Sequence, residues 1–463
     1  MEHYDLYIGD YENWGTHPLG LSRDDRRRHC YLVGQTGTGK STLLHSMITQ
    51  DIHRGEGVVL IDPHGPLADR VLASVPTFRE ADVIVLDPAN TDRPLGLNPL
   101  FGGHKLKQED RERKASRLHA ALKGIYEDSW GPELERVLMA SLLSLMDAPD
   151  ARPTLLSLLQ FLDDAEYRQR ISRHIKNRAA FLYVHKTLLN YKASEFAQKT
   201  SSTSNKVFQL VASSQLANVF GQYRPSFDFR RIMDDRKILI VRLNQGQLGE
   251  IYASLFGALL VSELLQAAFE RSLTAGDDLA DCYLYIDEFQ KVRTSSIDDT
   301  LSEARKYRLN LILAHQYLKQ INVDTHNAVF GNAGNTFAFR VSAEDAEELA
   351  RHHTKYSPET YTGLDNGRVI ASCLQSGTPR SPVQVRTPDF VVVYSDRRRQ
   401  RICNVSAYRY GRTRQKVERA INRELGITAW RAAKANARRA EKTIAKQRRR
   451  LGQLIDRKRR QRR

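Results

Sequence analysis

The chain has 463 residues, enough for two or three domains, and a net charge of +17 at pH 7. Residues 396–463 contain 25 Lys and Arg against 5 Asp and Glu, whereas the other 395 residues contain 46 Lys and Arg against 49 Asp and Glu. The excess of positive charge therefore lies in one segment and indicates a polyanionic partner, either nucleic acid or an acidic membrane surface. The four cysteines lack metal-binding spacing, and residues 1–28 are polar, so we expect buried thiols at Cys30 and Cys282, a reducing cytosol and no signal peptide.

The first predicted elements are a short strand at Tyr4–Ile8, a second strand at Tyr31–Val33 and a helix that ends near His53. A glycine-rich loop of the form G-x-x-x-x-G-K-S lies between the second strand and the helix. Its glycines allow successive N–H groups to point at a polyphosphate, and the start of the helix adds the positive end of its dipole. The predicted nucleotide-binding residues are Gly34, Gln35, Thr36, Gly37, Thr38, Gly39, Lys40, Ser41 and Thr42.

Each part of this loop has a chemical role in binding a nucleoside triphosphate. We expect Lys40 to reach the β- and γ-phosphates and the Ser41 hydroxyl to bind Mg²⁺. The apolar runs Val58–Ile61 and Val83–Leu86 predict buried parallel strands. Asp62 follows the first of them and is either a residue of the nucleotide site or a turn-forming residue before proline.

Residues 105–236 show helical patterns without strand-like runs, which predicts an all-α insertion. The stretch Lys199–Lys206 within it is either a phosphate contact or a plain surface loop or helix end. The predicted helices are Arg111–Tyr126, Pro132–Met146, Thr154–Leu162, Glu166–Ile175 and Phe181–Val219.

The sheet resumes with a predicted strand at Ile238–Leu243, followed by a helix at Tyr252–Ala268 that we interpret as a core helix rather than a membrane span. The next strand ends in an acid pair, in the sequence YLYIDE. We expect Asp287 to bind the Mg²⁺ shell and Glu288 to polarise the attacking water.

A helix at Ser296–Arg308 and a strand at Leu309–Ala314 lead to Gln316. Beside the acid pair, this amide is expected to contact the γ-phosphate and the attacking water. Arg305 is either a solvated helix charge or an arginine finger that enters the site of a neighbouring copy, with Arg340 as the weaker candidate for that role.

The remaining predicted strands are Thr336–Val341, Val369–Ser372 and Phe390–Val393. In the basic segment, Val417, Ile421 and Leu425 recur at helical spacing, and a second helix is predicted around residues 444–455. This segment is interpreted as a polyanion-binding or merely solubilising tail, either disordered or ordered only on a partner.

Taken together, these motifs resemble the HerA/FtsK superfamily of hexameric DNA-pumping ATPases, and within it the conjugative type IV secretion coupling proteins of the TraG/TraD type. The positions of Lys40, Asp287, Glu288 and Gln316 match the ATPase motifs of the superfamily, and Arg305 matches its proposed finger. The segments that carry the resemblance are Asp25–Leu44, Val58–Arg70, Gly96–Leu100, Tyr283–Gln290, Leu301–Gln316 and Ser342–Ala350.

The resemblance implies an α/β fold: a RecA-like P-loop NTPase sheet with an all-α insertion and a basic helical C-terminal tail. The expected parts are residues 1–104 and 237–395 for the motor domain, 105–236 for the insertion and 396–463 for the tail. It also implies a cytoplasmic ATPase that uses ATP and Mg²⁺, forms a homohexamer and moves DNA in conjugation or type IV secretion. The transmembrane anchor usual in coupling proteins is not recognised in the sequence, so we expect any contact with the inner face of the membrane to occur through partners.

Two other functions fit the same motifs. One is a HerA-type DNA end-processing translocase in repair, which would have a nuclease partner in place of a relaxase or secretion channel. The other is a nucleic-acid tether whose nucleotide site only switches assembly. The presence of Glu288 argues against a pure switch, because a switch has little need of a water-polarising acid.

Overall fold

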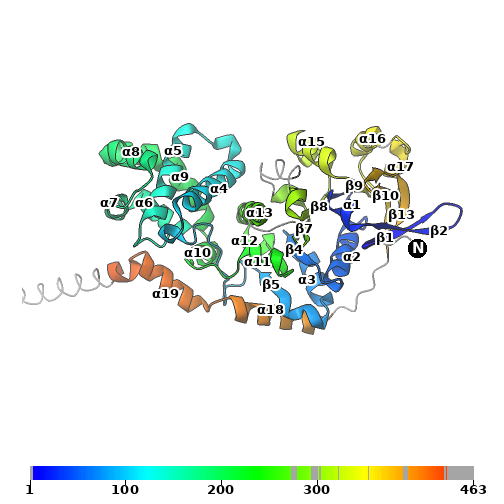
Figure 1. Cartoon of the computed structure of the whole chain (residues 1–463), viewed down its shortest axis with the longest axis horizontal. Helices are drawn as coiled ribbons and strands as arrows, with labels where there is room; N and C mark the ends of the chain where they lie inside the picture. Colours follow the sequence, from blue (N-terminus) through cyan, green and yellow to red (C-terminus); the bar gives the residue numbers. More distant parts are fainter. Residues whose placement is uncertain are drawn as a thin grey trace, which may run out of the picture.

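The computed structural model describes residues 4–272, 279–292, 301, 304–321, 323–352, 354–388, 395–431 and 434. These residues form an eleven-stranded sheet with the order β2-β1-β13-β10-β9-β3-β8-β7-β4-β6-β5. Figure 1 shows the sheet and its covering helices as one lobe and the helices that follow β5 as a second lobe. The predicted α/β fold is confirmed.

The strands from β9 to β5 in this order run parallel to their neighbours, whereas β10, β13, β1 and β2 pair in antiparallel fashion. A separate pair is formed by β11 (Leu374–Gln375) and β12 (Thr378–Pro379). The strands of the large sheet are β1 (Leu6–Glu12), β2 (Thr16–Leu21), β3 (Cys30–Val33), β4 (Gly57–Asp62), β5 (Val83–Leu86), β6 (Ile238–Arg242), β7 (Cys282–Ile286), β8 (Leu309–His315), β9 (Asn335–Ala338), β10 (Arg368–Ser372) and β13 (Val383–Arg386).

Helices cover both faces of the parallel strands, which is why most positions of these strands are apolar. Successive strand side chains point to opposite faces, so Leu32 packs with α2 (Lys40–His53) and α3 (Pro66–Ser74), while Val33 belongs to the core that contains α13 (Glu250–Ser272). Short elements complete this lobe: α1 (Arg23–Arg26), η1 (Thr77–Asp82), α12 (Gln245–Leu248), η5 (Phe289–Lys291), η6 (Ala304–Tyr307), η7 (Leu318–Gln320), α15 (Val323–Asn332), α16 (Ala343–His352) and α17 (Pro358–Thr362).

Helix α13 is long and apolar enough to cross a membrane by length and composition, and it is the one such helix among the described residues. In the structure, 67% of its most apolar window is buried. Its side chains Phe256, Leu259 and Leu260 have no exposed surface and belong to the core on one face of the sheet. The segment is thus a core helix, as the sequence predicted.

The region between β5 and β6 is fully described and contains helices and no strand. The range Phe181–Val219, predicted as one helical run, is three helices. The first ends because the Asn190 amide donates to the carbonyl oxygens of His185 and Lys186. The elements are η2 (Gly103–Lys105), α4 (Gln108–Ile125), η3 (Glu127–Ser129), α5 (Pro132–Asp147), α6 (Leu155–Asp163), α7 (Ala165–Ser172), α8 (Arg178–Lys186), η4 (Leu188–Asn190), α9 (Ala193–Val211), α10 (Ser214–Phe220) and α11 (Phe229–Asp234).

Several other predictions need correction. The first strand begins later than predicted and pairs with β2, which the sequence did not indicate. β9 is shorter than Thr336–Val341, and β13, which the sequence did not indicate, pairs with β10. The predicted strand Phe390–Val393 and the predicted helix near residues 444–455 lie outside the described residues. Of the predicted helix Ser296–Arg308, the structure describes Leu301 and residues 304–308, which include the 3₁₀ helix η6. Lys199–Lys206 lies on α9, so it is helix rather than loop.

The basic segment begins with two helices, α18 (Asp396–Tyr410) and α19 (Arg414–Glu424), that pack on the rest of the chain. Figure 1 shows them along one side of both lobes. Ile402 and Val417 are each 2% exposed, and the Ser406 hydroxyl accepts a hydrogen bond from the Val85 N–H at 2.8 Å. The prediction of a tail that is disordered or ordered only on a partner is therefore wrong for these two helices, because their few apolar side chains are sufficient to dock them.

This docking also uses part of the basic charge. Arg398 and Arg401 both pair with Glu80, and Arg399 pairs with Asp69 at 3.5 Å. The run Arg397–Arg399 was expected to be available to a polyanion, but two of its three arginines are in ion pairs within the chain. Polyanion binding therefore stays a prediction that concerns the residues after α19 more than α18.

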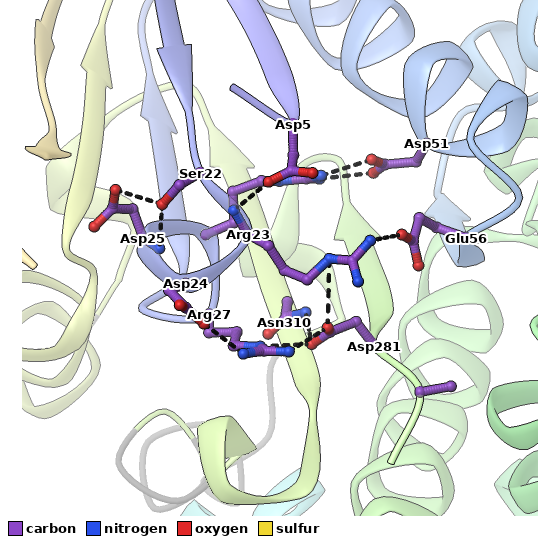
Figure 2. Close-up of polar contacts among 12 residues, drawn as sticks. Asp5, Ser22, Arg23, Asp24, Asp25, Arg27, Asp51, Glu56, Asp281 and Asn310 are labelled. Carbon is purple, nitrogen blue, oxygen red and sulfur yellow. Dashed lines mark hydrogen bonds and ion pairs between the residues drawn. The ribbon is translucent and has the colours of Figure 1, made fainter. Parts of the chain in front are cut away.

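An ion-pair cluster lies at the amino edge of the parallel strands, opposite the edge where the phosphate loop begins (Figure 2). Arg26 is 2% exposed and binds both carboxylate oxygens of Asp51 at 2.7 Å, while its guanidinium carbon lies 3.8 Å from the centre of the Tyr283 ring. Arg27 binds Asp281, the residue before β7, at 2.7 Å. The cluster thereby fixes α1 to α2 and to the start of β7.

Candidate functional site

The predicted phosphate loop lies between β3 and α2. Lys40 is buried in the first turn of α2, and its ammonium donates hydrogen bonds to the backbone oxygens of Gly34 and Gln35. Burial lowers the pKa of Lys40, and the carboxylates of Glu288 and Asp287 act against that shift. The other predicted loop residues are placed as follows: Thr36 and Gly37 are exposed at the tip, Thr38 and Gly39 lead into the helix, and Ser41 and Thr42 lie in its first turn.

Two glycines allow the loop to pack closely on the segments around β9 and β10. Gly39 has a φ of +119°, and a Cβ there would lie 3.2 Å from Phe339 Cε1 and 3.4 Å from Gly367 Cα. At Gly34 a Cβ would lie 2.5 Å from Phe339 Cβ. The Gly367 N–H also donates to the Thr38 carbonyl oxygen at 2.9 Å. The loop is therefore held by residues more than 290 positions later in the sequence.

Four adjacent strands, in the order β3-β8-β7-β4, bring the predicted residues to one edge of the sheet. Val33 pairs with His315, and Ile286 pairs with both Leu313 and Ile61, so the carboxyl ends of the four strands are level. The phosphate loop follows β3, Gln316 follows β8, and the acid pair follows β7. Asp62 is the last residue of β4. This edge is where open α/β sheets bind their ligands.

Glu288 is the most tightly held of these side chains. It is 6% exposed, and its two carboxylate oxygens accept hydrogen bonds of 2.7 Å from the side-chain amides of Gln316 and Gln290. Its backbone is left-handed, with a φ of +48°, which is uncommon for a residue other than glycine and accompanies functional sites. The structure thus brings Gln316 together with Glu288, as the sequence predicted.

Asp62 has the turn-forming role that the sequence left open, and it also lies at the edge of the sheet where the predicted nucleotide site is. Its carboxylate oxygens accept hydrogen bonds from the N–H groups of His64 and Ala68, both at 2.9 Å, so it caps the turn into α3. The same carboxylate also faces Asp287. Burial, followed by the charges of Asp62 and Glu288, raises the pKa of Asp287 to about 7.

The charge balance of the site suits a divalent cation. The carboxylates of Asp62, Asp287 and Glu288 are all buried, and Lys40 is the cation that the described residues place near Asp287. A hard cation with oxygen ligands, such as Mg²⁺, relieves this excess of negative charge. Asp287 and the Ser41 hydroxyl are the residues that would hold it.

We expect Asp287→Asn to stabilise the protein in the absence of divalent cations. An unfolded Asp has a pKa near 3.9, so the folded state binds the extra proton between about pH 4 and pH 7. The free energy of unfolding therefore falls as pH rises through this window, and the penalty is complete above pH 7. In EDTA at pH 8 the variant should melt a few degrees higher, corresponding to about 1–3 kcal/mol. The difference in melting temperature between the variant and the wild type should shrink at pH 5. An equal difference at both pH values would show that the raised pKa of Asp287 is not the cause.

The two candidate trans arginines lie in different places. Arg305 is exposed in η6, before the start of β8, and thus at the sheet edge opposite Glu288. Arg340 lies beside the phosphate loop of its own chain: its carbonyl oxygen accepts from the Gln35 N–H at 2.8 Å, and its guanidinium contacts Asn366 at 3.2 Å. Only Arg305 is therefore far from its own site and accessible to another copy.

Two residues around the site were not assigned a role from the sequence. Gln290 holds Glu288 from within η5, and only its position two residues after the acid indicates this. His315, the last residue of β8, is buried between the rings of Tyr31 and Phe289, and the Tyr31 hydroxyl lies 3.1 Å from its Nδ1. Burial, with a smaller effect of Lys40, lowers the pKa of His315 to about 3, so this imidazole is neutral.

Similar folds occur among solved structures. The plasmid coupling protein TrwB in complex with ADP and Mg²⁺ superimposes with a TM-score of 0.60 at 16% identity, covering 82% of this chain and 90% of that one. TrwB in complex with the non-hydrolysable GTP analogue GDPNP gives the same values. VirB4 of Thermoanaerobacter pseudethanolicus gives a TM-score of 0.58 at 12% identity, covering 84% and 98%. At these identities the likeness establishes the fold, which is that of the TrwB P-loop NTPases.

The sequence comparison is more specific. A search of curated proteins gave no match. The family model for the DNA-binding domain of type IV secretion-system coupling proteins matches residues 15–354, which contain the phosphate loop, the helical region and the acid pair. The match spans well over half of the chain, and the chain therefore belongs to the type IV secretion-system coupling protein family.

Proposed function

We propose that this protein is an ATP-driven motor that assembles into a ring, the hexamer implied by its resemblance, and moves DNA in conjugation or type IV secretion. The observation that carries the proposal is the position of Glu288, a buried carboxylate held by two amides at the same sheet edge as the phosphate loop. A nucleotide-controlled tether has no need of an acid oriented in this way. Membership of the coupling protein family favours DNA transfer over DNA repair.

The residues of the site divide the work of hydrolysis. The loop N–H groups and Lys40 bind the phosphates of ATP, while Ser41 and Asp287 hold Mg²⁺, which neutralises charge on the phosphates. Glu288 accepts a hydrogen bond from the attacking water and orients it in line with the γ-phosphate. Gln316, bonded to Glu288, senses whether the γ-phosphate is present.

Ring formation is proposed from the place of Arg305. This exposed arginine lies at the edge opposite its own site, so it can complete a nucleotide site only in a neighbouring copy. Hydrolysis at such a seam would be coupled to relative motion of adjacent copies and to displacement of DNA in a central channel. The basic residues after α19 would retain the DNA, and a relaxase or a secretion channel is the kind of partner that such a motor needs.

The test is an ATPase assay of the purified chain with and without DNA, at several salt concentrations. We expect DNA to stimulate hydrolysis in the wild type, with stimulation falling as salt rises. Lys40→Ala should lose nucleotide binding and hydrolysis under all conditions. Nucleotide binding without DNA-stimulated hydrolysis would reject the motor and favour the tether with an assembly switch.

A further inference from the structure

Two imidazoles and a carboxylate meet on the surface between α15 and α16, away from the phosphate loop. His326 lies on α15, while Glu348 and His352 lie one turn apart on α16 and therefore share a face of that helix. The Nε2 atom of His326 is 2.8 Å from Glu348 Oε1, and one ligand atom from each of the three residues lies within 4.8 Å of the others. Among the described residues, this is the one group of three or more metal-ligating side chains gathered so closely.

The two imidazole rings are held in place by one aromatic side chain. The Phe330 ring stacks on His352, with ring centres 4.5 Å apart and an angle of 14°, and contacts His326 at 4.5 Å. Phe330 also makes an edge-type contact with Tyr31, with ring centres 5.4 Å apart. Aromatic packing thus orients both rings before any ligand binds, as a preformed binding site requires.

The Nε2 atom of His326 is a buried polar atom that lies close to Glu348 without a well-aligned hydrogen bond. It is hidden from solvent, and within the described part of the chain it has no hydrogen-bond partner of acceptable geometry, although it lies close to Glu348. Buried polar atoms are almost always satisfied, so such an atom calls for a partner.

We propose that His326, Glu348 and His352 bind a divalent transition-metal ion, for which zinc is the best match. Two imidazoles and one carboxylate form a donor set that zinc prefers, whereas Mg²⁺ prefers the oxygen ligands of the nucleotide site. Tetrahedral zinc places its ligand atoms about 3.3 Å apart, so a small rearrangement of side chains accommodates it. His352 is exposed, so water can reach the site and serve as a further ligand.

The bound ion would join α15 to α16. It would thereby fix Phe330 against Tyr31, whose hydroxyl contacts the buried His315 that precedes Gln316. The expected effect is a more stable wall on one side of the nucleotide site. Binding of the ion itself needs neither ATP nor DNA, so the proposal is independent of the motor activity.

The test uses the untagged full-length protein, stripped with EDTA and titrated with Zn²⁺ against a chromophoric chelator, in the presence of excess Mg²⁺. We expect one equivalent to bind and the melting temperature to rise. Glu348→Gln and His352→Gln, both at accessible positions, should lower the Zn²⁺ affinity at least about tenfold and remove the rise in melting temperature. The absorption of bound Co²⁺ should report tetrahedral coordination in the wild type and disappear in both variants.

Two matched controls come from the same chain. Glu347→Gln changes the exposed neighbour of Glu348, and His174→Gln changes a half-exposed imidazole that faces a single carboxylate, Asp150, at 3.8 Å. Neither should alter binding. The proposal is overturned if the folded wild type takes up no stoichiometric Zn²⁺, in which case the cluster is an ion pair only. It is equally overturned if Glu348→Gln and His352→Gln, with melting temperatures in EDTA near that of the wild type, bind Zn²⁺ as the wild type does.

Discussion

Glu288→Gln is expected to lower the rate of ATP hydrolysis by about 10²–10⁴-fold while leaving ATP binding largely intact. The amide keeps the shape of the side chain but removes the negative charge that polarises the attacking water. The variant should therefore hold ATP without cleaving it. Single-turnover hydrolysis, measured beside equilibrium binding of a fluorescent ATP analogue, separates the two effects.

Glu347→Gln is the matched control, because it makes the same change at an exposed position on α16. It should hydrolyse ATP as the wild type does. A Glu288→Gln variant that retains more than about a tenth of the wild-type rate would show that another group activates the water. Loss of ATP binding together with hydrolysis would instead indicate that Glu288 supports the fold of the site.

Arg305→Ala is expected to lower the ATPase rate of the assembled protein by about 10³–10⁵-fold, the range known for arginine fingers. The physical reason is the loss of a cation that stabilises charge on the γ-phosphate in the transition state. Lys306→Ala is the matched control, since Lys306 is the exposed neighbour in the same 3₁₀ helix. It should keep its activity.

A mixing experiment distinguishes a trans role from a cis role. Lys40→Ala and Arg305→Ala should each be inactive alone, but a mixture should recover activity. At some seams, an intact Lys40 of one copy then meets an intact Arg305 of the next. Failure of the mixture to recover, with assembly confirmed by sedimentation, would contradict the trans role. An active Arg305→Ala protein would remove this residue from the site altogether.

The sequence was informative wherever a local pattern determines the structure. Val58–Ile61 and Tyr283–Ile286 are continuous apolar runs because their strands are buried on both faces. The glycine and lysine spacing of the phosphate loop is likewise local. The positions of Lys40, Glu288 and Gln316 at one edge follow from parallel strands with level carboxyl ends, so their proximity could be predicted without a structure.

What the sequence did not reveal depends on contacts between distant residues. β2 contains Pro18 and Gly20 and has three exposed residues, so it lacks the alternation that identifies a strand, and only its pairing with β1 makes it one. The packing of Phe339 and Gly367 against the phosphate loop joins positions more than 290 residues apart. Docking of α18 depends on Ile402 and on ion pairs to Glu80, which no periodicity within a basic helix predicts.

The position of α18 has a consequence for how copies of this chain can associate. β5 is the last strand at one end of the sheet, and a backbone donor of β5, the Val85 N–H, is bonded to Ser406 of α18. An uncovered terminal strand is a template on which another molecule can extend the sheet, the usual route to aggregation. The opposite end is formed by β2, where Pro18 has no N–H to offer. Both ends are thus poor templates for strand addition, so the ring proposed above would form through side-chain surfaces.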